Sequence, residues 1–280
     1  MDKLLLVDGM NLLFQMFFGM PARIVNSQGK AIQGTLGFVG ALGKILRMTK
    51  PTHVAVLFDG ECENPRKILD ASYKSQREDF SEAPEEDNPF SQLRDVYRAL
   101  DVLGLRHGET ENCEFDDWAA AYAHRYGDTT EVVIASWDSD FFQLITENVK
   151  VLRYRGDRSL LCDEAYIRQK LGIAPAQYAD FKSLTGDSAD YIRGAEGIGP
   201  KTAAALLHEF ATLDDLLSRA REISRPAVRE SVLRNTQRLR TNYQLIKLEG
   251  AAALPFPLEA LAYTPTELTT HQVLQAIGLR

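Results

Sequence analysis

The sequence predicts an α/β fold whose central sheet is mainly parallel and flanked by helices, followed by a smaller helical region. Three short and continuously apolar runs, at residues 4–7, 54–58 and 132–135, are typical of strands buried on both faces. Helical stretches separate these runs, and alternation of strands and helices predicts parallel strands. From Leu171 onward the pattern becomes helical.

Composition and charge narrow the class of protein. A chain of 280 residues can form one large domain or a domain with an appendage. Its apolar fraction of 45% and charged fraction of 25% are ordinary for a soluble protein. We find no apolar run of membrane-spanning length and no leader, and the three cysteines lack metal-ligand spacing. These features predict a reduced cytoplasmic protein with no membrane partner.

The remaining elements follow in order. Residues 12–18 suggest a buried helix or turn, residues 26–34 a loop, and residues 35–48 a helix with one apolar stripe. Residues 61–92 carry basic and then acidic side chains, which predicts an exposed and mobile segment. Further helices are expected at 93–103 and from Glu114, and a fourth strand begins at 149–152.

The helical region contains a glycine-rich turn at 194–203 that opens a helix reaching Phe210. Glycines let the backbone approach a ligand, and a helix N-terminus offers N–H groups to phosphate. A P-loop requires glycine immediately before lysine, whereas Pro200 precedes Lys201. A tight turn between packed helices is the alternative. The arginines of 218–248 suit either a face near DNA or a solvated helix surface, and the proline-containing C-terminal part predicts a wrapping tail.

Carboxylates follow the predicted strands. Asp8 and Asp59 follow two of these strands directly, and Asp138 and Asp140 lie shortly beyond the third. All four fall at the carboxyl edge of the predicted sheet, where ligands bind to parallel strands. A second acidic group, Glu114-Phe115-Asp116-Asp117, opens an alanine-rich helix. Capping of that helix explains its acids equally well when they are taken alone. Together the acids predict a metal cluster, since crowded carboxylates require protons or cations. This concentration also accounts for the net charge of −7 without excluding a nucleic-acid partner.

Three separated blocks now form a pattern: Glu114-x-Asp116-Asp117, Ser136-x-Asp138-x-Asp140, and Gly186-Asp187-x-x-Asp190 followed by the turn from Gly197 to Ala203. Their order and spacing resemble the 5′ nuclease superfamily, which includes flap endonucleases and the 5′→3′ exonuclease domain of bacterial DNA polymerase I. The resemblance covers about residues 1–250, and the chain looks like a stand-alone member.

The resemblance implies a PIN-like nuclease core over 1–170 with an arch or clamp at about 66–92. It also implies a DNA-binding subdomain of the helix–hairpin–helix type (helix–three-turn–helix) over 171–250, and we expect a tail at 251–280 that packs on the core. Two Mg²⁺ or Mn²⁺ ions would be bound. The first would be held by Asp8, Asp59, Glu114, Asp116 and Asp138. The second ion, or its water shell, would be held by Asp117, Asp140, Asp187 and Asp190.

The resemblance also assigns the basic and glycine-rich residues. Arg66, Tyr73, Lys74 and Arg77 match a block at the base of the arch that contacts the scissile phosphate. The turn Gly197, Ile198, Gly199, Pro200, Lys201 and Thr202 would hold duplex phosphates. Backbone carbonyls there would bind K⁺, at positions matching Leu184, Thr185, Arg193, Ala195 and Ile198. Ser139, Tyr191 and Arg193 depart from the family pattern, and residues 78–87 are more acidic than an arch.

The function implied is cleavage of DNA phosphodiesters at 5′ flaps, nicks or single-strand/duplex junctions by a monomeric, two-metal nuclease of DNA replication and repair. Two alternatives remain. A PIN-type ribonuclease shares the acidic core but does not need a duplex anchor. A non-catalytic DNA-binding module would gain nothing from nine carboxylates facing phosphate.

Overall fold

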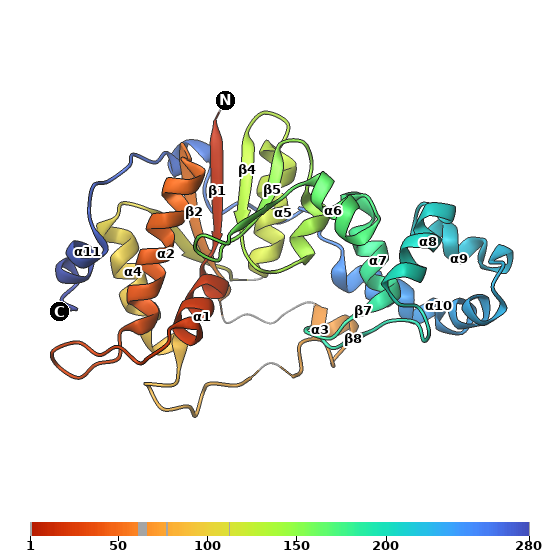
Figure 1. The fold of residues 1–280 in the computed structure, drawn as a ribbon, viewed down its shortest axis with the longest axis horizontal. Coiled ribbons are helices and arrows are strands. Elements are labelled where there is room, and N and C mark those ends of the chain that lie inside the picture. Colours follow the sequence, from red (N-terminus) through yellow and green to blue (C-terminus); the bar gives the residue numbers. More distant parts are fainter. Residues whose placement is uncertain (1, 61–65, 77, 112, 280) are drawn as a thin grey trace.

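The computed structural model describes residues 2–60, 66–76, 78–111 and 113–279. A six-stranded sheet with the order β3-β2-β1-β4-β5-β6 forms its centre (Figure 1). Neighbouring strands are parallel except that β6 runs antiparallel to β5. The mainly parallel α/β prediction is therefore confirmed. The strands are β1 (Lys3–Asp8), β2 (His53–Phe58), β3 (Arg106–Glu109), β4 (Glu131–Ala135), β5 (Val149–Arg153), β6 (Leu160–Cys162), β7 (Gly186–Asp187) and β8 (Ile192–Arg193), the last two forming a separate small ribbon.

Helices cover the sheet and form the second region. The α-helices are α1 (Gly9–Gly19), α2 (Gln33–Thr49), α3 (Arg66–Leu69), α4 (Leu93–Val102), α5 (Phe115–Tyr126), α6 (Glu164–Leu171), α7 (Tyr178–Thr185), α8 (Pro200–Phe210), α9 (Leu213–Ser218), α10 (Pro226–Ile246) and α11 (Thr270–Ala276). Short 3₁₀ helices occur at Pro89–Gln92, Asp140–Leu144, Pro175–Gln177, Ala220–Glu222 and Leu258–Leu261. No helix among the described residues combines the length and apolar character needed to cross a membrane.

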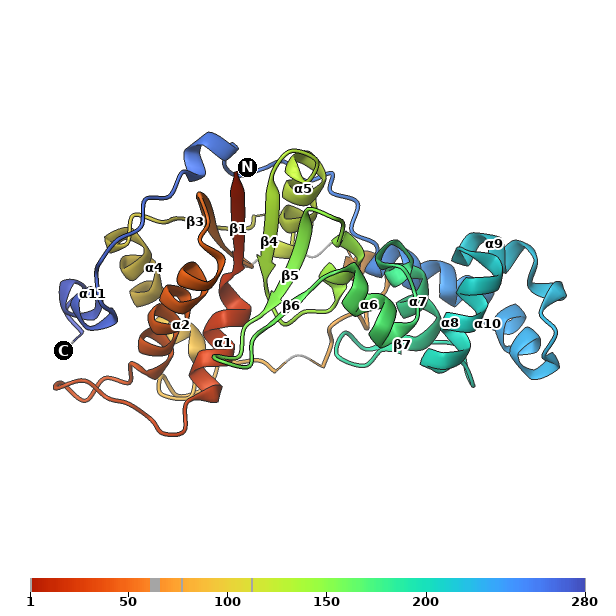
Figure 2. The same ribbon diagram turned by 45° about the horizontal axis from the view of Figure 1, so that its top comes forward.

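The strand β1 shows why the core has three layers. Successive side chains of a strand point to opposite faces. Leu4 and Leu6 accordingly pack in one cluster with residues of α5, whereas Leu5 and Val7 pack in another with residues of α2. All four side chains are buried. The central strands are thus apolar on both faces, with α5 behind the sheet and α1 and α2 in front (Figure 2).

The edge strand β3 was not predicted. It pairs with β2 on one side only, and its side chains are half-buried or exposed. Its residues, Arg106, His107, Gly108 and Glu109, therefore need not form an apolar run. Its parallel pairing with β2 brings Glu109 beside Phe58 in register. Tertiary pairing rather than local propensity therefore forms this strand.

The expectation that residues 61–92 would be exposed is only partly right for the described part of that segment. Phe80 is only 9% exposed. Its ring lies 5.6 Å from that of Phe14, 6.0 Å from Phe18 and 6.1 Å from Phe90. Arg23 adds ion pairs to Glu86 and Asp87. The acidic segment is therefore docked on α1 by aromatic packing, which single-chain polarity patterns do not reveal.

Helices α7–α10 extend from one end of the sheet, and α11 lies at the other end beside α2 and α4 (Figure 1). The apolar cluster behind the sheet continues into α7, α8 and α10, so this helical region shares the core of the sheet. Between these ends the C-terminal segment crosses the sheet: Tyr263 N–H donates to the Thr52 carbonyl at 2.8 Å. Val273 and Leu274 of α11 are buried against Val39 and Ala99.

Candidate metal centre

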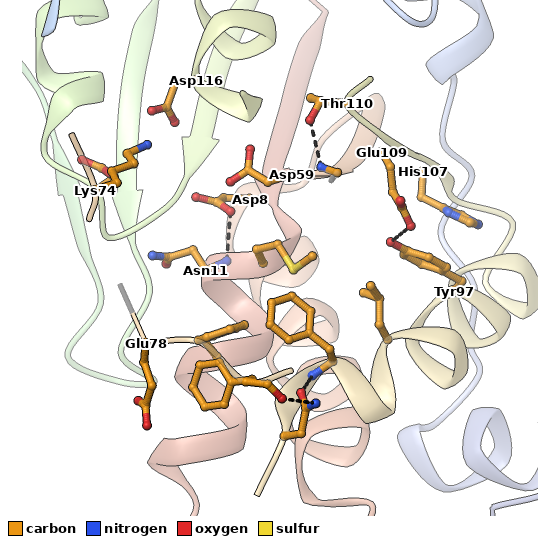
Figure 3. A pocket seen from close by; sticks show the side chains of 18 of the residues that line it. Asp8, Asn11, Asp59, Lys74, Glu78, Tyr97, His107, Glu109, Thr110 and Asp116 are labelled. Carbon is orange, nitrogen blue, oxygen red and sulfur yellow. Dashed lines mark hydrogen bonds between the residues drawn. The ribbon is translucent and has the colours of Figure 1, made fainter. Parts of the chain in front are cut away.

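Three strand ends bring aspartates into one cleft. Asp8 ends β1, Asp59 follows β2, and Asp138 lies three residues beyond β4. These strands are adjacent and parallel, so their carboxyl ends coincide. Asp116, from the first turn of α5, joins them on the wall of a cleft of about 1590 Å³. Figure 3 shows Asp8, Asp59 and Asp116 pointing toward a common space.

Hydrogen bonds orient these carboxylates. Asp8 caps α1, its Oδ1 accepting from Asn11 N–H at 3.0 Å, while its Oδ2 accepts from Ser136 Oγ at 2.8 Å. Asp59 Oδ1 accepts from Phe115 N–H at 2.6 Å, which ties β2 to the start of α5. Asn11 and Ser136 were not predicted to be site residues. Each lies within three residues of a predicted ligand, which was the available signal.

Burial and mutual repulsion disfavour the charged forms of these acids. Desolvation raises the pKa of Asp8 to about 7, and the Asp59 and Asp138 carboxylates add to this rise against the hydrogen bonds from Asn11 and Ser136. Burial, followed by the nearby Asp138, also raises the pKa of Asp116. A divalent cation would relieve this repulsion and be bound through oxygen ligands. The donor set therefore fits a hard divalent metal ion.

This shift predicts how the stability of the metal-free protein depends on pH. The folded pKa of Asp8 is about 7, above the roughly 3.9 of an unfolded aspartate. Between these two pH values the folded protein binds more protons than the unfolded chain. The contribution of Asp8 to the free energy of unfolding therefore falls as pH rises across this range. We expect the melting temperature in EDTA to fall more steeply from pH 5 to pH 8 in the wild type than in Asp8→Asn. Parallel pH profiles of the two proteins would contradict this expectation.

A second cluster lies beside the first. Carboxylate oxygens of Asp140, Asp187 and Asp190 lie within 4.8 Å of one another, an arrangement that suits a metal ion. Asp140 Oδ1 is buried without a hydrogen-bond partner among the described residues, although a buried acceptor ordinarily has one. The two clusters meet where Asp140 N–H donates to Asp138 Oδ1 at 2.8 Å. Burial and then the Asp138 carboxylate raise the pKa of Asp140.

Lys182 belongs to this second cluster and was not predicted. It forms an ion pair with Asp187, and both side chains are 13% exposed. Its charge also opposes the rise in the pKa of Asp140. Lys182 lies on α7 and Asp187 on β7, five residues later, so the pair spans the end of a helix and has no periodic signal in the sequence.

Glu114 and Asp117 are held differently from the other acids. Glu114 is the N-cap of α5, and its backbone N–H donates to Asp117 Oδ2 at 3.0 Å. Arg66 bonds both oxygens of Asp117, at 2.7 and 3.1 Å, and Glu114 Oε2 at 2.8 Å. Arg66 Nε also donates to the Leu245 carbonyl at the end of α10 at 3.0 Å. The structure therefore places Asp117 against Arg66 and outside the group of Asp140, Asp187 and Asp190.

Lys74 and Tyr73 also face Glu114. Lys74 forms an ion pair with Glu114 Oε1, and the Tyr73 hydroxyl lies 3.4 Å from Glu114 Oε2. Lys74 adopts a φ of 55°, a left-handed conformation unusual outside glycine, and its N–H donates to the Asp190 carbonyl at 3.1 Å. This backbone turn places the ammonium in the cleft. The fourth residue of the predicted block, Arg77, lies outside the described residues.

The glycine-rich turn is exposed at the start of α8. Gly197, Gly199, Pro200 and Lys201 are exposed, whereas Ile198 is buried and Thr202 is half-buried. Gly199 caps the helix and Pro200 occupies its first turn. Gly197 has a φ of +74°, which glycine adopts without strain. The turn thus presents backbone N–H groups and the Lys201 ammonium to solvent, as a phosphate site requires.

The predicted K⁺ carbonyls lie around the β7–β8 ribbon. The Leu184 carbonyl accepts a hydrogen bond from Ala195 N–H at 2.9 Å. The Ala195 carbonyl accepts one from Ile198 N–H at 3.1 Å. The Arg193 carbonyl accepts from Asn242 Nδ2 at 2.9 Å. Thr185 ends α7 directly before the ribbon. The backbone is crowded here, since a Cβ on Gly194 would lie 2.4 Å from the Leu184 oxygen.

Two family models match successive parts of the chain. Residues 3–172 match the 5′-3′ exonuclease N-terminal resolvase-like domain, and residues 173–269 match the 5′-3′ exonuclease C-terminal SAM fold. DNA polymerase I of Rhizobium leguminosarum is 37% identical over 273 residues, which cover 94% of this chain and 26% of that protein. The thermostable DNA polymerase I of Thermus aquaticus is 33% identical over 88% of this chain and 28% of its own length. The chain thus spans about a quarter of these relatives.

Solved structures share the fold at lower identity. The zinc-bound T5 5′-exonuclease superposes with a TM-score of 0.73 at 22% identity, covering 88% of this chain and 90% of that one. The catalytic core of Rad2 in complex with DNA substrate gives 0.60 at 18% identity, over 89% and 80% of the two chains. With both family models matched in order along one core, the chain belongs to the 5′-3′ exonuclease family.

Proposed function

We propose that this protein is a divalent-metal-dependent 5′ nuclease that hydrolyses DNA phosphodiesters at 5′ flaps or 5′ ends during DNA replication or repair. The observation that carries the proposal is a pair of adjacent acidic clusters. The first lines the cleft, and the second is joined to it where Asp140 N–H donates to Asp138. A two-metal site suits phosphodiester hydrolysis because it stabilises both the attacking and the leaving oxygen.

The residues divide between two metal positions. Asp8, Asp59, Asp116 and Asp138, with Glu114, would hold the first ion, and Asp140, Asp187 and Asp190 the second. All-oxygen ligand sets favour Mg²⁺ or Mn²⁺. Bound there, the ions would supply Lewis-acid activation of water and of the phosphate. In our proposal Asp117 acts through Arg66, which it orients beside Glu114.

In this proposal Lys74 stabilises negative charge on the scissile phosphate. Its ammonium lies on the cleft wall together with Asp8, Asp59 and Asp116, and Tyr73 lies buried next to it. Positive charge aimed at a reacting phosphate lowers the barrier most where water is excluded. The burial of Tyr73 raises its pKa, so its hydroxyl stays protonated as a hydrogen-bond donor.

Duplex DNA is the partner that the second region suits. The exposed turn from Gly197 to Lys201 offers N–H groups and one ammonium, which contact phosphates without reading bases. K⁺ bound by the carbonyls of the β7–β8 region would add positive charge beside this turn. Because a PIN-type ribonuclease does not need such an anchor, the turn favours DNA with a duplex arm as substrate. The monomeric state, the cytoplasmic location and the domain limits stay predictions.

The test is cleavage of a 5′-labelled DNA flap in Mg²⁺, in Mn²⁺ and in EDTA, beside an RNA flap of the same sequence. We expect cleavage of DNA that EDTA abolishes. Products centred on the junction would identify a flap endonuclease, and short 5′ products released stepwise would identify an exonuclease. Preferential cleavage of the RNA flap, or tight DNA binding without cleavage in either metal, would overturn the proposal.

A further inference from the structure

The cleft continues beyond the metal centre to a wall that the proposed chemistry does not use. Tyr97, His107 and Glu109 line it together with Met10 and Leu93. Figure 3 shows Tyr97, His107 and Glu109 across the cleft from Asp116 and Lys74, on the far side of Asp8 and Asp59. The proposed metal chemistry does not account for an aromatic and polar wall at this position.

Hydrogen bonds and ring contacts connect the residues of this wall. Tyr97 Oη donates to Glu109 Oε1 at 2.5 Å, and its ring packs edge-on against Phe58 with centroids 4.9 Å apart. The His107 ring stacks on Tyr97 at 5.1 Å with an interplanar angle of 16°. His107 Nε2 in turn lies 3.1 Å from Asp101 Oδ1. Tyr97 therefore orients the exposed Glu109 carboxylate through its Oε1 atom.

The acidic lining of the cleft disfavours a phosphate away from the proposed metal ions. Glu78, Asp79, Glu109 and Glu111 line the cleft in addition to the aspartates of the metal centre. Lys74 is the one lysine among the described lining residues, which include no arginine, and it forms an ion pair with Glu114. A group that enters here from DNA must be uncharged, flat and rich in hydrogen-bond donors. A nucleobase has these properties, and aromatic and apolar walls such as Met10, Leu93 and Tyr97 suit its faces.

We propose that Tyr97, His107 and Glu109 form a subsite for an unpaired guanine base of the nucleotide next to the scissile phosphate. A carboxylate only accepts hydrogen bonds. Guanine is the DNA base whose Watson–Crick edge carries two adjacent donors, N1–H and N2–H, so it bonds both oxygens of Glu109. Thymine offers one donor between two carbonyls, and adenine and cytosine each place a ring acceptor beside their amino group. This edge is available only in an unpaired base.

The inference rests on the proposed nuclease function and adds a base preference to it. The test uses two series of 5′ flaps, one varied at the unpaired nucleotide before the cleavage site and one at the unpaired nucleotide after it. In each series the varied nucleotide carries guanine, the base of inosine, or thymine. Inosine keeps N1–H and lacks the N2 amino group. At one of the two positions we expect kcat/KM for guanine to exceed that for thymine about tenfold, with inosine between them, as one bidentate contact supplies. Glu109→Gln, which replaces one acceptor with a donor, should abolish the difference.

Glu111→Gln is the matched control, because it removes the same charge two residues along the same segment. It should retain the guanine preference. Equilibrium binding of the same flaps in EDTA supplies a readout independent of cleavage, with the same ordering of affinities expected. Cleavage or binding that is equal for the three bases, or equal loss of preference in both variants, would overturn the subsite. Absence of cleavage in Mg²⁺ and Mn²⁺ would instead overturn the proposed function, and the binding series would then decide the subsite alone.

Discussion

Asp116→Asn is expected to reduce flap cleavage in Mg²⁺ by about 10³-fold or more and to raise the melting temperature measured in EDTA. The amide keeps the shape of the side chain but supplies weaker metal ligation, and a loss of about 4 kcal/mol of transition-state stabilisation corresponds to this factor. Stability should increase because Asp116 is desolvated and lies near Asp138, both of which raise its pKa and disfavour its charge. A gain of about 1 kcal/mol raises the melting temperature of a chain this large by roughly 2–4 °C.

A substitution that lowers cleavage but raises the melting temperature identifies a metal ligand, because loss of a structural residue would lower activity and stability together. Asp128→Asn is the matched control, because Asp128 is exposed just beyond α5. Exposed substitutions of this kind stay within about 0.5 kcal/mol of the wild type. Cleavage assays and thermal melts in EDTA and in Mg²⁺ measure both effects. Retention of activity in Asp116→Asn, or a loss of stability in EDTA, would contradict the role of Asp116 in the metal centre.

Arg66→Ala is expected to lower the free energy of unfolding by about 3–5 kcal/mol, the usual cost of removing one partner from a buried ion pair. The Arg66 side chain is 12% exposed and contacts two acids of the α5 N-terminus. Its loss leaves Glu114 and Asp117 without their guanidinium partner, and removes the bond from Arg66 Nε to α10. Urea unfolding at neutral pH measures the change through the transition midpoint.

Two further variants make this result interpretable. Arg66→Lys keeps the charge but loses the planar two-pronged geometry, so its stability should fall between those of the wild type and Arg66→Ala. Arg168→Ala removes an exposed arginine paired with Glu164 on one helix. Pairs of that kind contribute about 0.3–0.5 kcal/mol. If Arg66→Ala cost no more than Arg168→Ala, the buried network around Glu114 would not stabilise the fold as the geometry indicates.

Much of the fold follows from local pattern. The apolar runs at 4–7, 54–58 and 132–135 became β1, β2 and β4, because strands buried on both faces require continuous apolar side chains. The three aspartates at their ends then had to meet, since parallel strands share a carboxyl edge. The strand β3 had no such signal, because an edge strand needs neither an apolar run nor alternation.

The segment at 66–92 shows the limit of composition as a guide. Its many acids predicted an exposed chain, yet the position of Phe80 is set by three aromatic rings from α1 and from the Pro89–Gln92 turn. Hydrophobic contacts between residues far apart in sequence cannot be read from local polarity. Lys182 and the stacked pair of Tyr97 and His107 were also missed, because their contacts join residues of neighbouring elements and not positions of one periodic pattern.

The sequence by itself determined the central strands of the sheet, the glycine-rich turn and which acids could bind metal, because these depend on local periodicity and on where strands end. Only the tertiary structure decided how those acids divide. It placed Asp140, Asp187 and Asp190 together and directed Asp117 to Arg66. That division depends on contacts between residues far apart in the chain. Arg66 binds Asp117, 51 residues away, and the Leu245 carbonyl, 179 residues away.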